Sequence, residues 1–226
     1  MRENLTELVF ILDRSGSMSG LESDTIGGFN SMIGKQKKGE GEVLVSTVLF
    51  DDDCDVIHDR VNIEDIRDMT DEDYFVGGST ALLDAVGDAI KHIANVHKYA
   101  REEDRPAKTV FVITTDGMEN ASRHYNHRDI KKLIEKQKEK SGWEFIFLGA
   151  NIDAVEVAGH IGIDSKRAVN YYSDGAGTAK NFSALGSVIA CARNSKCSAD
   201  MSIMLDEECW REEIDEDFSR RKSGKK

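Results

Sequence analysis

Apolar runs of strand length alternate along the chain with segments in which apolar residues recur every three or four positions. Four runs rich in Val, Ile and Phe predict buried β-strands, at residues 5–12, 43–50, 109–115 and 143–148. Helical spacing predicts helices at residues 23–37, 82–93, 130–137, 153–160 and 175–191. Strands that alternate with helices indicate an α/β protein whose parallel sheet is covered by helices on both faces.

The second strand is followed closely by a third, which departs from this alternation. Residues 54–61 predict that third strand, and only Asp51, Asp52 and Asp53 separate it from Phe50. Because no crossover helix fits in so short an interval, we expect an antiparallel hairpin at a sheet edge. A short helix is expected at 63–69, and a sixth strand at 167–172.

The sequence becomes densely charged after about residue 198. Acidic residues crowd positions 206–217 and basic residues crowd 220–226, a composition that favours a mobile or weakly helical tail. The alternative is a docked helix with one apolar stripe, formed by Trp210, Ile214 and Phe218. We therefore expect one domain at 1–197 followed by a charged tail at 198–226.

Composition and charge exclude several classes of protein. The chain has 226 residues, is 39% hydrophobic and carries a formal net charge of −12. Such a charge disfavours nucleic acid and anionic membranes as partners. The first residues lack the apolar core of a signal peptide, and no apolar run approaches the roughly 18 residues of a membrane span. We expect a cytoplasmic protein that is monomeric or a weak oligomer.

The four cysteines give no metal-binding pattern. Cys54, Cys191, Cys197 and Cys209 form neither a C-x-x-C pair nor a zinc spacing with histidine. Reduced thiols are expected, with a Cys191–Cys197 bridge as the less favoured alternative.

Oxygen donors collect at the predicted ends of two strands and at the start of one helix. Asp13, Ser15 and Ser17 follow the first strand, Thr80 precedes the helix at 82–93, and Asp116 follows the strand at 109–115. Ligands of doubly wound sheets bind outside the carboxyl ends of the strands. Two carboxylates and three hydroxyls suit a hard divalent cation, with Mg²⁺ the best fit and Mn²⁺ or Ca²⁺ as alternatives. A carboxylate from a partner protein is the natural outside ligand.

Each of these residues also has a structural interpretation. Asp13 or Ser15 can cap a turn, Thr80 can be a helix N-cap, and Asp116-Gly117 is a common turn dipeptide. Their joint occurrence at one edge of one sheet favours the metal site.

The same residues carry a family resemblance. Asp-Arg-Ser-Gly-Ser at 13–17, the Thr of Gly-Gly-Ser-Thr at 77–80 and Thr-Thr-Asp-Gly at 114–117 closely resemble the von Willebrand factor type A (VWA) domain and its metal-ion-dependent adhesion site (MIDAS). The resemblance covers about residues 5–192. It implies a Rossmann-like, doubly wound sheet of six strands in the order 3-2-1-4-5-6, with strand 3 antiparallel. It also implies that Ser15, Ser17 and Thr80 bind the metal through hydroxyls, with Asp13 and Asp116 binding directly or through water.

Enzyme interpretations fit the sequence less well. A dehalogenase-type phosphatase needs a second Asp where Ser15 stands, and Met18 occupies the centre of the Gly16–Gly20 segment where a nucleophile elbow needs Ser. We therefore expect a non-enzymatic module that binds an acidic residue of a partner, similar to bacterial cytoplasmic VWA proteins. The alternative is a Mg²⁺-dependent phosphoester hydrolase that uses Asp13, Asp116, Glu119 or a loop histidine as general base. A site kept only for structure is a third interpretation.

Several other polar residues have open roles. The acidic residues at 51–55 predict either a solvated hairpin turn, which is favoured, or a second cation site. Glu119 and Asn120 are expected to line the rim of the metal site. His124 and His127 are expected to be surface residues, since no third ligand accompanies them.

Overall fold

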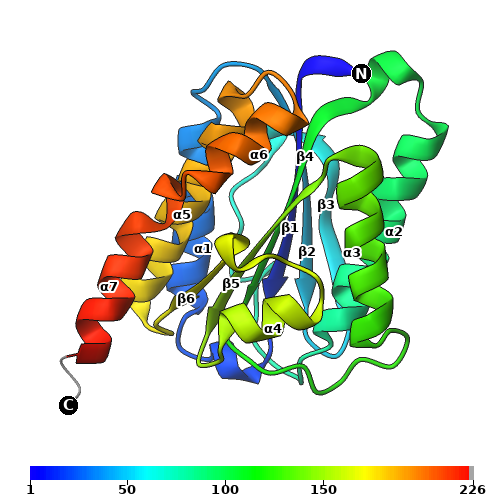
Figure 1. Ribbon diagram of the computed structural model, residues 1–226. Helices are drawn as coiled ribbons and strands as arrows, with labels where there is room; N and C mark the ends of the chain where they lie inside the picture. The colour runs from blue at the N-terminus through cyan, green and yellow to red at the C-terminus, as the bar shows by residue number, and fades with distance from the viewer. Residues whose placement is uncertain (224–226) are drawn as a thin grey trace.

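A computed structural model describes residues 1–223, and Figure 1 shows its sheet between two layers of helices. Six strands form one sheet in the order β3-β2-β1-β4-β5-β6. Their bounds are β1 Arg2–Asp13, β2 Glu42–Phe50, β3 Cys54–Asn62, β4 Pro106–Thr115, β5 Glu144–Ala150 and β6 Ala168–Tyr171. All neighbouring strands pair in parallel except β2 and β3, which form the antiparallel hairpin. The predicted strand order and hairpin are confirmed.

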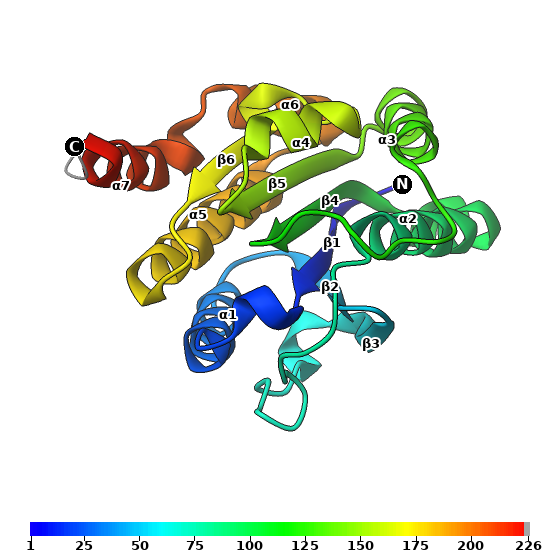
Figure 2. The same cartoon turned by 90° about the horizontal axis from the view of Figure 1, so that it is seen from below.

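Helices cover both faces of the sheet, as Figures 1 and 2 show. One layer holds α1 Glu22–Gln36, α5 Gly175–Asn194, α6 Ser198–Asp206 and α7 Glu212–Ser223. The other holds α2 Leu82–Tyr99, α3 His127–Ser141 and α4 Ala154–His160. Short 3₁₀ turns connect some elements: η1 Gly16–Met18, η2 Ile63–Asp65, η3 Glu102–Asp104, η4 Ser165–Arg167 and η5 Cys209–Arg211.

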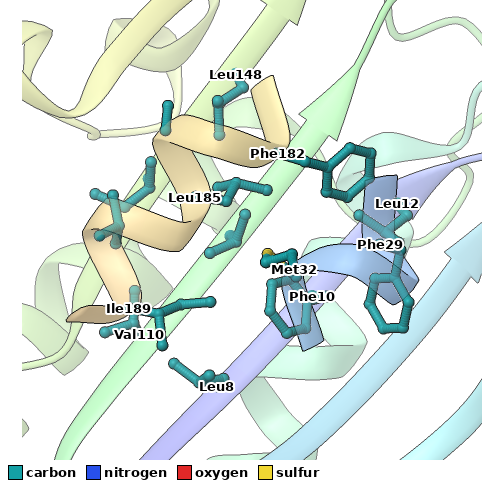
Figure 3. Packing of buried hydrophobic residues seen from close by; sticks show 14 of the residues in the cluster. Leu8, Phe10, Leu12, Phe29, Met32, Val110, Leu148, Phe182, Leu185 and Ile189 are labelled. Carbon is teal, nitrogen blue, oxygen red and sulfur yellow. The ribbon is translucent and has the colours of Figure 1, made fainter. Parts of the chain in front are cut away.

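Side chains of β1 alternate between two hydrophobic cores. Leu8, Phe10 and Leu12 pack toward the layer of α1 and α5, as Figure 3 shows, whereas Val9 and Ile11 pack toward α2. All five are buried, which explains why β1 is apolar at every position from Leu8 to Leu12. A Cβ atom at Gly28 of α1 would lie 2.2 Å from the ring of Phe182, so the missing side chain allows α1 and α5 to pack closely.

The helix expected at residues 63–69 is reduced to the single turn η2. Ile66 and Met69 are buried as that helix would require, but their backbone groups bond to the side chains of Lys37, just after α1, and of Asn30 within it. The Asn30 amide donates to the Met69 carbonyl over 2.9 Å and accepts from the Met69 N–H over 2.8 Å. Long-range hydrogen bonds therefore replace the local ones of a helix.

The structure also differs from the expectation of a solvated tail. Residues 198–223 form α6, η5 and α7, and only 224–226 lie outside the described residues. Trp210 and Ile214 are 3% and 1% exposed and belong to the core that also contains residues of α5. The ring of Phe218 packs at a tilt against that of Tyr172, with 4.9 Å between the ring centroids. The apolar stripe thus outweighs the charged composition, because burying two large side chains stabilises by several kcal/mol.

Two smaller expectations concern cysteine and membranes. All four cysteines are free, so the Cys191–Cys197 bridge does not form. Among the helices of residues 1–223, none is long and apolar enough to cross a bilayer.

The open edge of the sheet is irregular. Strand β3 lies at that edge, and its register against β2 shifts on both sides of Thr47. Arg60 within β3 has a φ of 52°, which is unusual for a residue with a side chain. Its guanidinium reaches the buried carboxylate of Glu7 on β1.

A substitution at Ile214 tests whether the tail belongs to the core. Replacing Ile214, 1% exposed, by Ala is expected to lower the free energy of unfolding by about 2–5 kcal/mol. The control is Ile203→Ala in α6, where Ile203 is 63% exposed and a change within about 0.5 kcal/mol is expected. Urea denaturation measures both. Equal midpoints for Ile214→Ala and wild type would contradict the docked tail.

Candidate metal centre

Strands β1 and β4 bring two acidic loops together at the carboxyl-terminal end of the sheet. β1 ends on Asp13 and β4 on Thr115, next to Asp116, and the two strands are parallel neighbours. Figure 2 looks onto this edge from below. The Thr115 hydroxyl donates to Asp13 Oδ2 over 2.5 Å, which joins the two loops directly. From β1 the chain adds β2 and β3 on one side of the sheet, and then β4, β5 and β6 on the other. The carboxyl ends of β1 and β4 are therefore the switch point where such folds bind ligands.

Three hydroxyls from two loops converge on Gly117. A Cβ atom at that glycine would lie 3.0 Å from Thr80 Oγ1, 3.1 Å from Ser17 Oγ and 3.8 Å from Ser15 Oγ. The hydroxyls of Ser15 and Ser17 are themselves 3.0 Å apart. The absence of a side chain at Gly117 therefore keeps open a small space lined by oxygen donors.

Asp13 is buried and held on several sides. Its Oδ1 accepts the Ser15 N–H over 2.7 Å, and it is 1% exposed. Burial raises the pKa of the Asp13 carboxyl, while the hydrogen bonds from Ser15 and Thr115 oppose this rise and the charge of Asp116 adds to it. A cation bound here would favour the ionised form.

Asp116 has an unused acceptor. Its Oδ2 accepts from the Ser173 hydroxyl over 2.9 Å, whereas the buried Oδ1 has no hydrogen-bond partner among residues 1–223. A buried carboxylate oxygen without a partner is costly, because it has lost its hydration. The atom is therefore suited to a cation or to a water bound to one.

Backbone hydrogen bonds fasten the Asp116 loop to the start of α2. Glu119 accepts from the N–H groups of Leu83, Ala121 and Ser122 over 2.8–3.0 Å, and from the Ser122 hydroxyl over 2.7 Å. Asn120 Oδ1 accepts the Thr80 N–H over 2.9 Å. Glu119 and Asn120 thus fix the position of Thr80 relative to Asp116, a more specific role than the expected one at the rim.

Asp84 completes this fastening. Its carboxylate accepts the backbone N–H groups of Arg123, His124 and Tyr125 over 2.7–3.0 Å. Although burial raises the pKa of Asp84, these three hydrogen bonds and the charge of His124 lower it below its ordinary value.

The acidic hairpin at 51–55 is paired with an arginine. Arg14, 4% exposed, donates to Asp51 over 2.9 Å and forms an ion pair with Asp55 at 2.7 Å. The cation beside this turn is thus a guanidinium, which favours the hairpin interpretation. His124 and His127 are exposed, as expected.

The donor set fits a hard cation. Within residues 1–223, no group of three or more His, Cys, Asp or Glu side chains is placed to hold a metal ion, so any centre here depends on hydroxyls. Two carboxylates and three hydroxyls suit Mg²⁺, Mn²⁺ or Ca²⁺ better than a softer metal.

Three supporting residues were missed from the sequence. Thr115 and Ser173 bind the two acidic residues directly, and Asp84 holds the loop. An acidic residue four positions after Thr80, in the first turn of a helix, was an available signal for Asp84. Ser173 offered none, because it lies in the loop after β6, which β5 separates from β4 in the sheet, and only the packing of the loops brings it to Asp116.

Comparison with known proteins identifies the family. A sequence model of the von Willebrand factor type A domain matches residues 7–184. No curated protein sequence matches the chain.

Solved structures share the fold at low identity. A mutant of the PilB minor pilin from Streptococcus sanguinis is 13% identical with a TM-score of 0.53, and the match covers 81% of this chain and 61% of the pilin. Proximal thread matrix protein 1 from the mussel byssus, with a zinc-occupied MIDAS motif, is 17% identical with a TM-score of 0.54. The match covers 81% of this chain and 45% of the mussel protein. The ArnB paralog VWA2 from Sulfolobus acidocaldarius is 20% identical with a TM-score of 0.51. The match covers 83% of this chain and 44% of the paralog.

The chain thus spans less than two thirds of the length of each of these solved proteins. At these identities the similarity lies in the fold. Because the family model covers most of its length, the chain belongs to the von Willebrand factor type A domain family.

Proposed function

We propose that this protein is a metal-dependent protein-binding module. Asp13, Ser15, Ser17, Thr80 and Asp116 would hold a Mg²⁺ ion, and a partner protein would supply an Asp or Glu carboxylate. The observation that carries the proposal is the convergence of three hydroxyls on Gly117, next to the unpartnered Oδ1 of Asp116. VWA domains generally mediate protein–protein interactions, which supports the same function.

The charges of the five residues favour an acidic partner. When bound, the ion would act as a Lewis acid that fixes and polarises the partner's carboxylate. Asp13 and Asp116 would bring two negative charges, and the hydroxyls of Ser15, Ser17 and Thr80 bring none. The divalent charge is then balanced but not exceeded, so a third carboxylate is not repelled.

The hydrogen bonds of the site support binding over hydrolysis. A phosphoester hydrolase needs a general base with a free acceptor near the metal. Both oxygens of Asp13 accept hydrogen bonds, and both oxygens of Glu119 accept from the loop that it fastens. His124 lies 3.5 Å from Asp84, to which its imidazole turns. Asp116 Oδ1 is an acceptor without a partner in the described chain, but in this proposal it faces the cation or a water bound to it, and it is therefore not free to act as a general base.

Two further features bear on the metal and the compartment. The mussel protein with zinc in its MIDAS motif supports a divalent cation, while the all-oxygen donor set here favours Mg²⁺ over zinc. Four free cysteines agree with a reducing compartment such as the cytoplasm. A bacterial origin and a monomeric or weakly oligomeric state remain predictions.

Added metal should stabilise the protein if the centre is built as proposed. Mg²⁺ at about 100 times its dissociation constant adds about 2.7 kcal/mol, which for a chain of this size raises the Tm by about 5–10 °C. Ser17→Ala should lose most of this shift. Ser19→Ala is the matched control, since Ser19 is exposed in the same loop and makes no side-chain hydrogen bond in the described chain. Differential scanning calorimetry with Mg²⁺ or EDTA makes the measurement, and an unshifted wild type would contradict the site.

Burial of Asp13 predicts that, in the metal-free protein, replacing this carboxylate by a neutral side chain stabilises the fold. The folded pKa of Asp13 is raised above its usual value of 3.8, so the ionised form destabilises the fold at neutral pH. Asp13→Asn should therefore unfold at a higher temperature than wild type in EDTA at pH 7. The difference should shrink as the pH falls through the raised pKa, where wild type becomes protonated. A less stable variant at pH 7 would show that the hydrogen bonds outweigh burial.

The partner is tested by metal-dependent capture. Immobilised wild type in Mg²⁺ should retain a protein that EDTA releases, and Thr80→Ala should reduce the retained amount about tenfold or more, since it removes one hydroxyl ligand. Thr70→Ala is the control, because Thr70 is exposed and its hydroxyl bonds, within residues 1–223, only to half-buried Asp73. A partner retained equally in EDTA would contradict a metal-bridged contact. Phosphoesterase turnover abolished in Asp116→Ala would instead favour the hydrolase.

A further inference from the structure

A second surface lies at the opposite end of the sheet from the candidate metal centre. A groove of about 830 Å³ runs between the carboxyl-terminal halves of α2 and α3, from Ile90 to Lys98 and from Leu133 to Ser141. Arg105 and Trp143, which precede β4 and β5, close its end. In Figure 1 these two helices stand side by side at the right of the sheet.

The groove is positively charged in an acidic protein. Lys98, Arg105, Lys136 and Lys140 line it, and no Asp or Glu residue does. Lys91 also borders the groove, but its ammonium lies over the Tyr125 ring, whose hydroxyl binds Asp88. The formal net charge of the chain is −12, so four clustered cations depart from the general character of its surface.

None of these four cations is neutralised within the described chain. Lys136 and Lys140 make no ion pair there. Arg105 donates to the Ala100 carbonyl over 3.0 Å, and Lys98 to the Tyr99 hydroxyl over 3.4 Å, which are neutral acceptors. The carboxylate of Glu7, which contacts the lining residue His97, is engaged by Arg60 and His97.

Helix dipoles account for only part of this charge. Lys98 and Lys140 lie in the last turns of α2 and α3, where cations favourably oppose the negative end of a helix. Each helix end carries about half a negative charge, so two ends offset about one of the four cations. The helix ends therefore do not offset most of the positive charge that lines the groove.

The floor of the groove is apolar except for one donor. Ile90, Ala94 and Leu133 contribute aliphatic surface from the two helices. Trp143 is 3% exposed and packs between His97 and Phe111, yet its indole N–H makes no hydrogen bond within residues 1–223. This N–H is not among the buried polar atoms that lack a partner, so it reaches the surface of the groove and is a donor available to a bound ligand.

The size and charge of the groove select among anions. The eight residue steps from Ile90 to Lys98 span about 12 Å of helix, which matches a short segment and not an extended duplex. A larger anion such as a nucleic acid or an anionic bilayer would also meet the rest of a chain whose formal net charge is −12. An apolar floor below a cationic rim complements a peptide with both aliphatic and acidic side chains.

We propose that the groove between α2 and α3 binds a short acidic peptide segment of a partner protein. Carboxylates of the segment would pair with Lys98, Arg105, Lys136 and Lys140. An aliphatic side chain would lie on Ile90, Ala94 and Leu133, and one carbonyl or carboxylate oxygen would accept the Trp143 N–H. The site is independent of metal and lies far from the edge that carries Asp13.

A labelled synthetic peptide tests the site on the full chain in EDTA, which removes any contribution from the metal centre. The probe alternates Glu and Leu over seven residues, and its control has Gln in place of Glu. Fluorescence anisotropy in low salt should show that the acidic peptide binds and that the Gln peptide does not. Raising the ionic strength should weaken it, because exposed charge pairs are screened.

Two double variants of α3 locate the contact. Lys136→Glu with Lys140→Glu should weaken binding about tenfold or more, because two attractive charges become repulsive. Lys132→Glu with Lys138→Glu is the matched control, expected to change affinity less than about twofold, because these exposed lysines of α3 do not line the groove. Each pair lowers the formal net charge by 4, from −12 to −16.

The NMR signals of the two tryptophan indole N–H groups show, in the unsubstituted protein, whether the peptide contacts the floor of the groove. In a ¹H–¹⁵N spectrum, the indole N–H signal of Trp143 should move on peptide addition, while that of Trp210, which donates to the Leu205 carbonyl, should not. Equal loss of binding in both double variants, or equal binding of the Gln peptide, would overturn the proposal. Binding of tripolyphosphate or phosphatidylserine vesicles in place of the peptide would overturn the peptide class.

Discussion

Strand β1 pairs in parallel with both β2 and β4 and is covered by helices on both faces, and the rest of the structure depends on this arrangement. A strand buried in this way excludes almost every polar side chain from its length. From Leu8 to Leu12 β1 carries no polar side chain, and Asp13 follows where this stretch ends, while Glu7, buried before it, is paired with Arg60 and His97. Because β4 is equally buried and runs in the same direction, the polar residues that follow it reach the same edge as Asp13.

The parts of the site that could be predicted are those encoded by local order. Asp13 and Asp116 follow apolar runs, and parallel pairing then requires them to be near each other. The contacts that hold them could not be read in this way. Ser173 reaches Asp116 across 57 positions, and Glu119 binds the N–H of Leu83 from a segment without a motif of its own. Such pairings are fixed only by the packed arrangement of loops.

The same distinction explains where the fold was misjudged. The stripe of Trp210 and Ile214 had the correct spacing, but the density of charge around it suggested solvent. In the structure the charges point outward in local pairs such as Arg211 with Asp215, and the apolar side chains turn inward. Residues 63–69 show the reverse case, since apolar spacing suggested a helix where Asn30 supplies the hydrogen bonds instead.

The irregular edge strand β3 has a consequence for the behaviour of the protein at high concentration. A regular edge nine residues long would offer unpaired N–H and C=O groups to the same edge of a second molecule. The register shifts beside Thr47, the left-handed backbone at Arg60 and the carboxylates of Asp55 and Asp59 interrupt that row. Stacking of sheets edge to edge, the first step toward an aggregate, is thereby disfavoured in the folded state.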